Sequence, residues 1–168
     1  SPPISTLSLH DPLPIYQDYL QRSMLDIVET EPEALNQETY QYIVDVISKV
    51  ARDPHEAANQ LSNISSQYAY YYGIMIRTKR LLDDAEDALE NFKASSRTSR
   101  RSEGVKLTAV AAEDYVQSLE LTGDLNNKVR HRKESYGYAK GICNTLEMKK
   151  DMLIQLSANS RQESKLYQ

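Results

Sequence analysis

The chain is 168 residues long, 40% of its residues are hydrophobic, and its formal net charge is −4. This length suits one domain with a single core and is too short for two ordinary domains. The longest apolar runs, such as residues 152–154, are far shorter than a membrane span, and residues 1–14 show no basic start followed by an apolar stretch. We therefore expect a cytoplasmic protein that does not contact a membrane.

Charge is distributed unevenly along the sequence. Residues 1–60 carry three basic and ten acidic side chains, whereas residues 125–168 carry nine basic and four acidic ones. Such asymmetry indicates either a polyanion that binds the basic end or contacts between acidic and basic parts of neighbouring copies of the chain. The charge pattern leaves both interpretations open.

The first 52 residues are predicted to form an extended arm and two short helices. Four prolines exclude a helix from residues 1–14. Apolar residues at 3.6-residue spacing predict one helix from Pro14 to about Glu31 and another from about Pro32 or Asn36 to Ala51. Each helix is apolar on one side only, so each must pack against another element.

The strongest helix signal begins at Asp53. Asp53, Pro54 and Glu56 supply an N-capping carboxylate, a proline at the first helical position and a glutamate at the third. Apolar or small residues then recur at heptad spacing for about five heptads, which predicts a coiled-coil-like helix roughly 60 Å long. The heptad positions are Leu61, Tyr68, Met75, Leu82 and Leu89, with Ile64, Tyr71, Thr78, Ala85 and Phe92 three residues after each.

A polar, basic loop is predicted over residues 95–107, where the apolar pattern ends. Thr108 can cap a short helix that ends near Gly123, and Asp124 can cap a last helix that runs to about Lys165. Because the last helix also has heptad spacing, the two long helices should pair antiparallel.

The predicted fold is therefore all-α. It is a long, coiled-coil-like antiparallel helical hairpin with short N-terminal helices and an extended N-terminal arm. Residues 1–52 form its N-terminal part and residues 53–168 form the hairpin.

No pattern indicates catalysis, a metal or a cofactor, so we do not expect an enzyme. The acidic residues 83–90 could hold magnesium as in all-helical nucleotide hydrolases, but the last helix offers no matching carboxylates. A solvated face or a row of interhelical salt bridges is the competing interpretation. The three histidines lack zinc-ligand spacing, and the single cysteine, Cys143, falls in an apolar stripe typical of a core.

Basic residues on both sides of the predicted connection between the long helices are the candidate binding site. Cations with aromatic rings among them are what sequence-tolerant single-strand binders use. The candidate nucleic-acid-binding residues are Arg97, Arg100, Arg101, Lys106, Lys128, Arg130, Arg132, Lys133, Tyr136 and Lys140. Tyr138 is a second tyrosine that could stack bases. In the alternative interpretation the cations only keep the helices soluble, and Tyr136 belongs to the core.

Two further features indicate close contacts. The tyrosines at positions 68, 70, 71 and 72 surround their helix on several sides, which suits burial between chains. Gly137 and Gly141 destabilise a helix unless another backbone or a ligand comes close.

Three segments of the sequence resemble the phage recombination mediators related to UvsY. They are the tyrosine-rich residues 66–72, the helix opening at residues 107–109, and residues 139–157, where a helix of small residues runs into a leucine, a basic residue and an apolar turn. The resemblance covers about residues 57–165. It implies a small helical protein that forms rings, binds single-stranded DNA and loads a RecA-like recombinase. Where mediators carry basic residues in the first long helix, this chain has Arg77, Lys79 and Arg80 followed by acidic residues.

We therefore expect a mediator-like accessory protein of DNA recombination and repair that forms a homo-oligomer. Its expected partners are single-stranded DNA, a RecA-like recombinase and a single-strand binding protein, in the host cytoplasm if a phage encodes it. The alternative is a helical structural or assembly protein, of a virion for example, with contacts to proteins only. The apolar, proline-rich arm of residues 1–14 favours this alternative.

Overall fold

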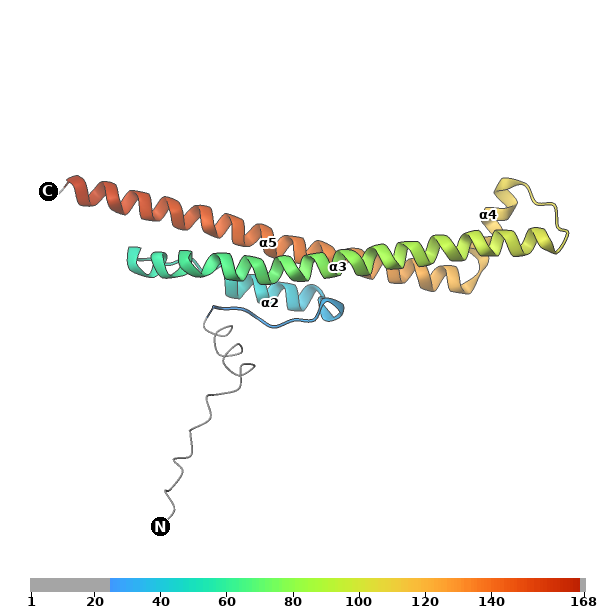
Figure 1. The fold of residues 1–168 in the computed structure, drawn as a ribbon, viewed down its shortest axis with the longest axis horizontal. Helices are drawn as coiled ribbons and strands as arrows, with labels where there is room; N and C mark the ends of the chain where they lie inside the picture. Colours follow the sequence, from blue (N-terminus) through green and yellow to red (C-terminus); the bar gives the residue numbers. More distant parts are fainter. Residues whose placement is uncertain (1–24, 167–168) are drawn as a thin grey trace, which may run out of the picture.

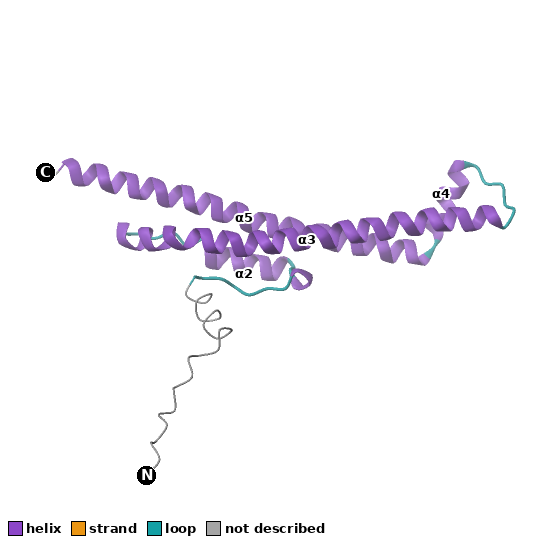
Figure 2. Cartoon of the chain, in the orientation of Figure 1, coloured by secondary structure: helices purple, strands orange, loops and turns teal. Residues whose placement is uncertain are grey.

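The computed structural model describes residues 25–166, and most of this part of the chain is helical (Figure 1, Figure 2). The elements are a short 3-10 helix η1 (Pro32–Ala34) and the α-helices α2 (Gln37–Ile47), α3 (Pro54–Ser102), α4 (Ala109–Ser118) and α5 (Glu120–Leu166). No strand occurs among the described residues. The all-α prediction is thus confirmed. The predicted arm, residues 1–14, lies outside the described part of the chain.

The helices α3 and α5 form the predicted antiparallel hairpin, an elongated rod that the other elements flank (Figure 1). Two contacts fix their register. The Tyr68 hydroxyl donates a hydrogen bond to Glu147 Oε1 at 3.1 Å, and the Lys79 ammonium lies 5.9 Å from the centre of the Tyr136 ring. Towards its C-terminal end α5 diverges from α3 (Figure 1).

The start of α3 is the one predicted, but its end is not. Asp53 accepts hydrogen bonds from the backbone N–H groups of His55 and Glu56, both at 2.9 Å, which confirms the N-cap. The predicted loop over residues 95–107 is wrong for its first part, because α3 continues to Ser102. In this last stretch serine and threonine hydroxyls donate to carbonyls of the preceding turn, which satisfies these polar side chains within the helix. Gly104, with a φ of 80°, lies in the connection that follows.

The junction between α4 and α5 is shorter than the sequence indicated. Thr108 caps α4 as predicted, since its hydroxyl accepts a hydrogen bond from the Ala111 N–H at 3.2 Å. However, α4 ends at Ser118 and α5 begins at Glu120, so Asp124 is not an N-cap and Gly123 lies inside α5. The buried Thr122 hydroxyl donates to the Val116 carbonyl at 2.6 Å and ties the two helices together.

The hydrophobic core lies where α2 packs on the hairpin. Ile43 and Ile47 of α2 are fully buried in one cluster with residues of both long helices. Cys143 belongs to this cluster, which confirms its predicted place in the core, and burial raises the pKa of its thiol to about 11. Helix α2 begins and ends within the predicted range of residues 36–51.

An extended segment, residues 25–36, connects to α2 and is called the strap here. The part of the predicted first helix that is described, residues 25–31, is turn and extended chain in this strap. Gln67 donates to the Leu25 carbonyl, and the Tyr71 hydroxyl accepts from the Val28 N–H at 2.9 Å. At the far end, the Ser135 hydroxyl of α5 donates to the Leu35 carbonyl at 2.8 Å. The strap is therefore fastened to both long helices.

Contacts with the strap account for two of the four clustered tyrosines, Tyr70 and Tyr71. The Tyr70 hydroxyl accepts from the Thr30 N–H at 3.2 Å, and burial raises the pKa of Tyr71 to about 12. These two tyrosines are used within the chain, whereas Tyr68 and Tyr72 stack on each other at 5.8 Å and Tyr72 is 44% exposed. Tyr68 also bonds to Glu147 and packs against the core, so of the four tyrosines only Tyr72 is open to the contact between chains that the sequence predicted.

Of the two glycines in α5 that we singled out, one is crowded. A Cβ on Gly141 would lie 3.0 Å from the ring of Tyr40, whereas one on Gly137 would meet nothing within 4 Å. The predicted close approach thus occurs at Gly141, and its cause is the aromatic ring of α2. No helix within residues 25–166 has an apolar stretch long enough to cross a membrane.

Candidate nucleic-acid interface

The predicted binding residues fall into two groups that differ in their partners. Arg97, Arg100, Arg101 and Lys106 lie at the tip of the hairpin, where α3 ends. The remaining six lie along α5, between Lys128 and Lys140. At 1.5 Å per residue, the helix rises about 30 Å from Glu120 to Lys140. The candidates therefore do not form the compact patch that a shared connection suggested.

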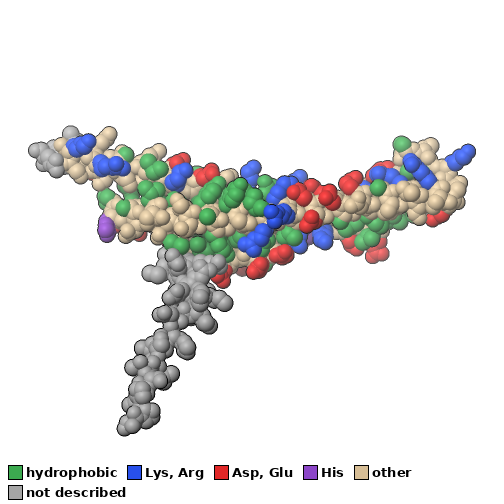
Figure 3. All heavy atoms as spheres, in the orientation of Figure 1, with side chains coloured by type: hydrophobic (Ala, Val, Ile, Leu, Met, Phe, Trp, Pro, Cys, Tyr) green, Lys and Arg blue, Asp and Glu red, His purple; other side chains and the backbone are tan. Residues whose placement is uncertain are grey.

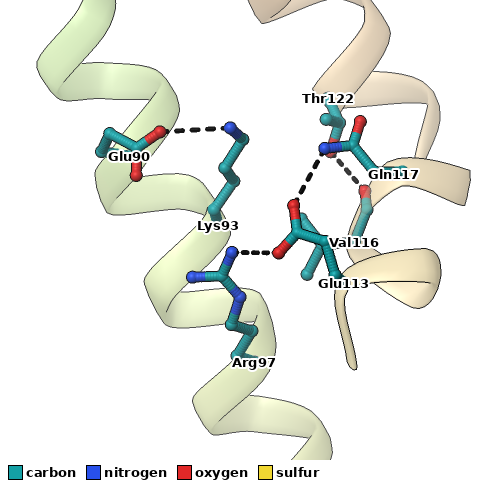
Figure 4. Close-up of polar contacts among 7 residues, drawn as sticks. All are labelled: Glu90, Lys93, Arg97, Glu113, Val116, Gln117 and Thr122. Carbon is teal, nitrogen blue, oxygen red and sulfur yellow. Dashed lines mark hydrogen bonds and ion pairs between the residues drawn. The ribbon is translucent and has the colours of Figure 1, made fainter. Parts of the chain in front are cut away.

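At the tip, Arg97 serves a structural role. It forms an ion pair with Glu113 of α4, whose other carboxylate oxygen accepts a hydrogen bond from Gln117 at 3.0 Å (Figure 4). The bond from Gln117 and the one from Arg97 hold the pKa of the Glu113 carboxyl below its usual value. Lys93, one turn before Arg97, pairs with Glu90 at 3.1 Å (Figure 4). Of these contacts, the ion pair of Arg97 with Glu113 joins α4 to α3.

Arg100 is likewise engaged, but its two neighbours are not. Its guanidinium pairs with Glu103 at 2.8 Å and lies 5.0 Å from the centre of the Tyr115 ring. Arg101 and Lys106 are exposed and form no ion pair within the described residues. Of the four candidates at the tip, two are thus available for a ligand.

Along α5 the cations are free of acidic partners. Lys128, Arg130, Lys133 and Lys140 are exposed, Arg132 is half-buried, and none of the five forms an ion pair within residues 25–166. Successive residues of a helix are about 100° apart, so Lys128 and Arg132 share one side, whereas Arg130 points to the opposite side. The free cations surround this part of α5.

The tyrosines of this segment are partly occupied. Tyr136 is half-buried, and the Lys79 ammonium covers its ring while pairing with Asp83. Tyr138 stacks on Tyr40 of α2 with the ring centroids 5.1 Å apart. The structure therefore uses Tyr138 to dock α2, and a base would have to approach Tyr136 from its remaining open side.

The acidic stretch of α3 lies beside the basic start of α5. The register set by Tyr68 with Glu147 and by Lys79 with Tyr136 places residues 83–90 opposite about residues 125–132. In Figure 3, Lys and Arg side chains gather near the middle of the rod, with Asp and Glu side chains near them. Most acids of the stretch are exposed, and no cluster of three or more potential metal ligands is found within the described residues.

Sequence reasoning missed two arginines. Arg77 and Arg80 of α3 are exposed, form no ion pair within residues 25–166, and line surface grooves together with acids of the strap. Their exposure follows from α3 burying residues such as Ile74 and Thr78 against the rest of the fold. The run Arg77, Lys79, Arg80 was visible in the sequence, but its proximity to the strap was not.

The chain was also compared with known proteins. Comparisons with protein-family models, curated proteins and solved structures found no match at the thresholds used.

Proposed function

We propose that this protein is an oligomeric accessory factor of DNA recombination that binds single-stranded DNA through α5 and assists a RecA-like recombinase. The main support is the set of five cations from Lys128 to Lys140 that have no acidic partner within the described residues. Phosphates attract such cations and release counterions when they bind, which supplies most of sequence-independent affinity. Arg97, by contrast, is occupied by Glu113 of α4.

The recombination role rests on the resemblance to the phage mediators related to UvsY. The segments that carry this resemblance lie in α3, α4 and α5, the helices that build the hairpin. The recombinase and the single-strand binding protein remain partners that this resemblance implies.

Self-association is the second part of the proposal. Large apolar side chains remain exposed on α3 and α5, among them Tyr72 at 44%, Met148 at 67% and Ile154 at 47%. A rod formed mainly by two helices leaves such faces open, and neighbouring copies would cover them. The same observation favours the second candidate function, a structural or assembly protein with contacts to proteins only.

Two matched variants test the DNA-binding role. Lys133→Gln with Lys140→Gln removes two free cations of α5, and Lys49→Gln with Arg52→Gln removes two exposed cations outside α5. We expect the first pair to weaken binding of a labelled single-stranded oligonucleotide. It should also lower the salt dependence by about 0.7 in slope for each lost phosphate contact. The second pair should bind like the wild type.

Two results would contradict the proposal. If the wild-type protein shifts no oligonucleotide at low salt, or if both pairs weaken binding to the same extent, α5 is not the DNA-binding element. The assembly protein is then the better candidate.

A further inference from the structure

The middle of the strap is acidic. Glu29, Glu31 and Glu33 alternate with Thr30 and Pro32, and all three carboxylates are exposed. The strap is fastened at its start to Gln67 and Tyr71 of α3, and at its end to Ser135 of α5, as described above. Three acids are therefore held in a fixed place between the two long helices.

On the side of α3, these acids lie close to arginines. Glu31 and Glu33 line a groove of about 290 Å³ whose other wall includes Arg77 and Arg80. Glu29 and Glu31 line a neighbouring groove of about 420 Å³, and Arg77 again contributes to it. The acidic strap thus runs past two cations of α3.

On the side of α5, Glu33 lines a third groove, of about 400 Å³, together with Lys128, His131 and Arg132. Glu33 is therefore shared between the cations of α3 and those of α5. Yet no ion pair within residues 25–166 involves any of the four cations Arg77, Arg80, Lys128 and Arg132. Glu31 and Glu33 lower the positive potential of this surface without forming salt bridges to these four cations.

We propose that the strap is an internal polyanion beside a cationic surface built jointly by α3 and α5, and that its carboxylates compete with the phosphate backbone of single-stranded DNA for the cations of this surface. Arg77 and Arg80 are then DNA-binding residues, in addition to those on α5. This inference rests on the proposed function, because it names the second half of the same binding surface and the element that restrains it.

The test neutralises the acids of the strap. Glu31→Gln with Glu33→Gln keeps side-chain size, and both side chains are exposed, so the fold should be retained. The control, Asp151→Asn with Glu163→Gln, removes the same charge from exposed positions near the other end of α5. A third variant, Arg77→Gln with Arg80→Gln, removes the cations of α3. Binding of a labelled poly-deoxythymidine oligonucleotide is measured for all of them by fluorescence anisotropy at low and moderate salt.

We expect the strap variant to bind roughly three- to tenfold more tightly than the control, since each nearby charge contributes modestly at a solvated surface. The arginine variant should bind more weakly than the wild type. Equal affinities of the strap variant and the control, or unchanged binding by the arginine variant, would overturn this inference while DNA binding by α5 stands. If neither the wild type nor the strap variant binds, the proposed function itself fails.

Discussion

The middle and the tip of the hairpin differ in how much apolar surface they bury. In the middle, α2 and the strap cover the long helices, and fully buried residues such as Ile47, Ile74 and Ile142 form one apolar cluster. At the tip, α4 buries Ala112 and Val116 outside that cluster and is also held by the ion pair of Arg97 with Glu113 (Figure 4). Burial of apolar surface is the stronger of these terms.

This difference bears on which part of the hairpin stabilises the fold and which part is available to a ligand. The middle should determine the global free energy of unfolding, whereas the tip should open locally at lower cost. The free cations of α5 lie between these two regions, on a helix that the middle makes rigid. A rigid helix holds its cations in fixed positions, which lowers the entropy that a bound ligand loses.

The largest expected effect comes from a cavity in the middle. Leu146→Ala removes a side chain that is 1% exposed in the apolar cluster, and we expect a loss of about 2–5 kcal/mol in the free energy of unfolding. Leu89→Ala, nearer the tip, should fall at the low end of this range because that part of α3 lies outside the cluster. Urea denaturation followed by circular dichroism compares the two variants. A greater loss in the free energy of unfolding for Leu89→Ala would show that the middle does not determine global stability.

The next effect concerns the fastening of the strap. Tyr71→Phe removes the hydroxyl that accepts from the Val28 N–H, and we expect it to cost about 1–2 kcal/mol. Tyr72→Phe removes an exposed hydroxyl that makes no hydrogen bond within the described residues, so it should leave stability unchanged. Equal effects of the two substitutions in the same denaturation experiment would show that the strap adds nothing to the stability of the middle.

A smaller effect distinguishes the two glycines of α5. Gly137→Ala should stabilise the protein by about 0.5–1 kcal/mol, because alanine is the better helix former and nothing lies near its Cβ. Gly141→Ala should not show this gain, since its Cβ would press on the Tyr40 ring and disturb the stack with Tyr138. Thermal melting measures both, and a similar rise for the two variants would contradict the close contact of α2.

The smallest effect lies at the tip and depends on pH. The pKa of Glu113 is lowered in the folded protein, so its contacts stabilise the docking of α4 at neutral pH, and this stabilisation is lost as pH falls through that pKa. We expect a carboxyl titration by NMR to give a value below the usual 4.5. Arg97→Gln should raise it. A wild-type value at or above 4.5 would show that these contacts do not form in solution.

Heptad spacing and capping residues predicted much of this fold. Asp53 and Thr108 cap helices as expected, because their hydrogen bonds are local and depend only on neighbouring residues. The loop over residues 95–107 was mispredicted because the end of α3 is contacted by α4, through Arg97 with Glu113 and Arg100 with Tyr115, and no local pattern shows these contacts.

The candidate site was less predictable. Which cations are free depends on partners distant in sequence, as with Arg97 and Glu113, and no local pattern reports such pairs. Gln67 shows the same limit in the core, since a polar residue outside the heptad positions is buried because its amide bonds the strap.

The most direct test of the account is the mass of the protein in solution, measured by light scattering with and without a single-stranded oligonucleotide. The account predicts an assembly of several chains that gains the mass of bound oligonucleotide at low salt and loses it at high salt. A single chain at every concentration, with no change on adding the oligonucleotide, would contradict both the self-association and the DNA-binding role.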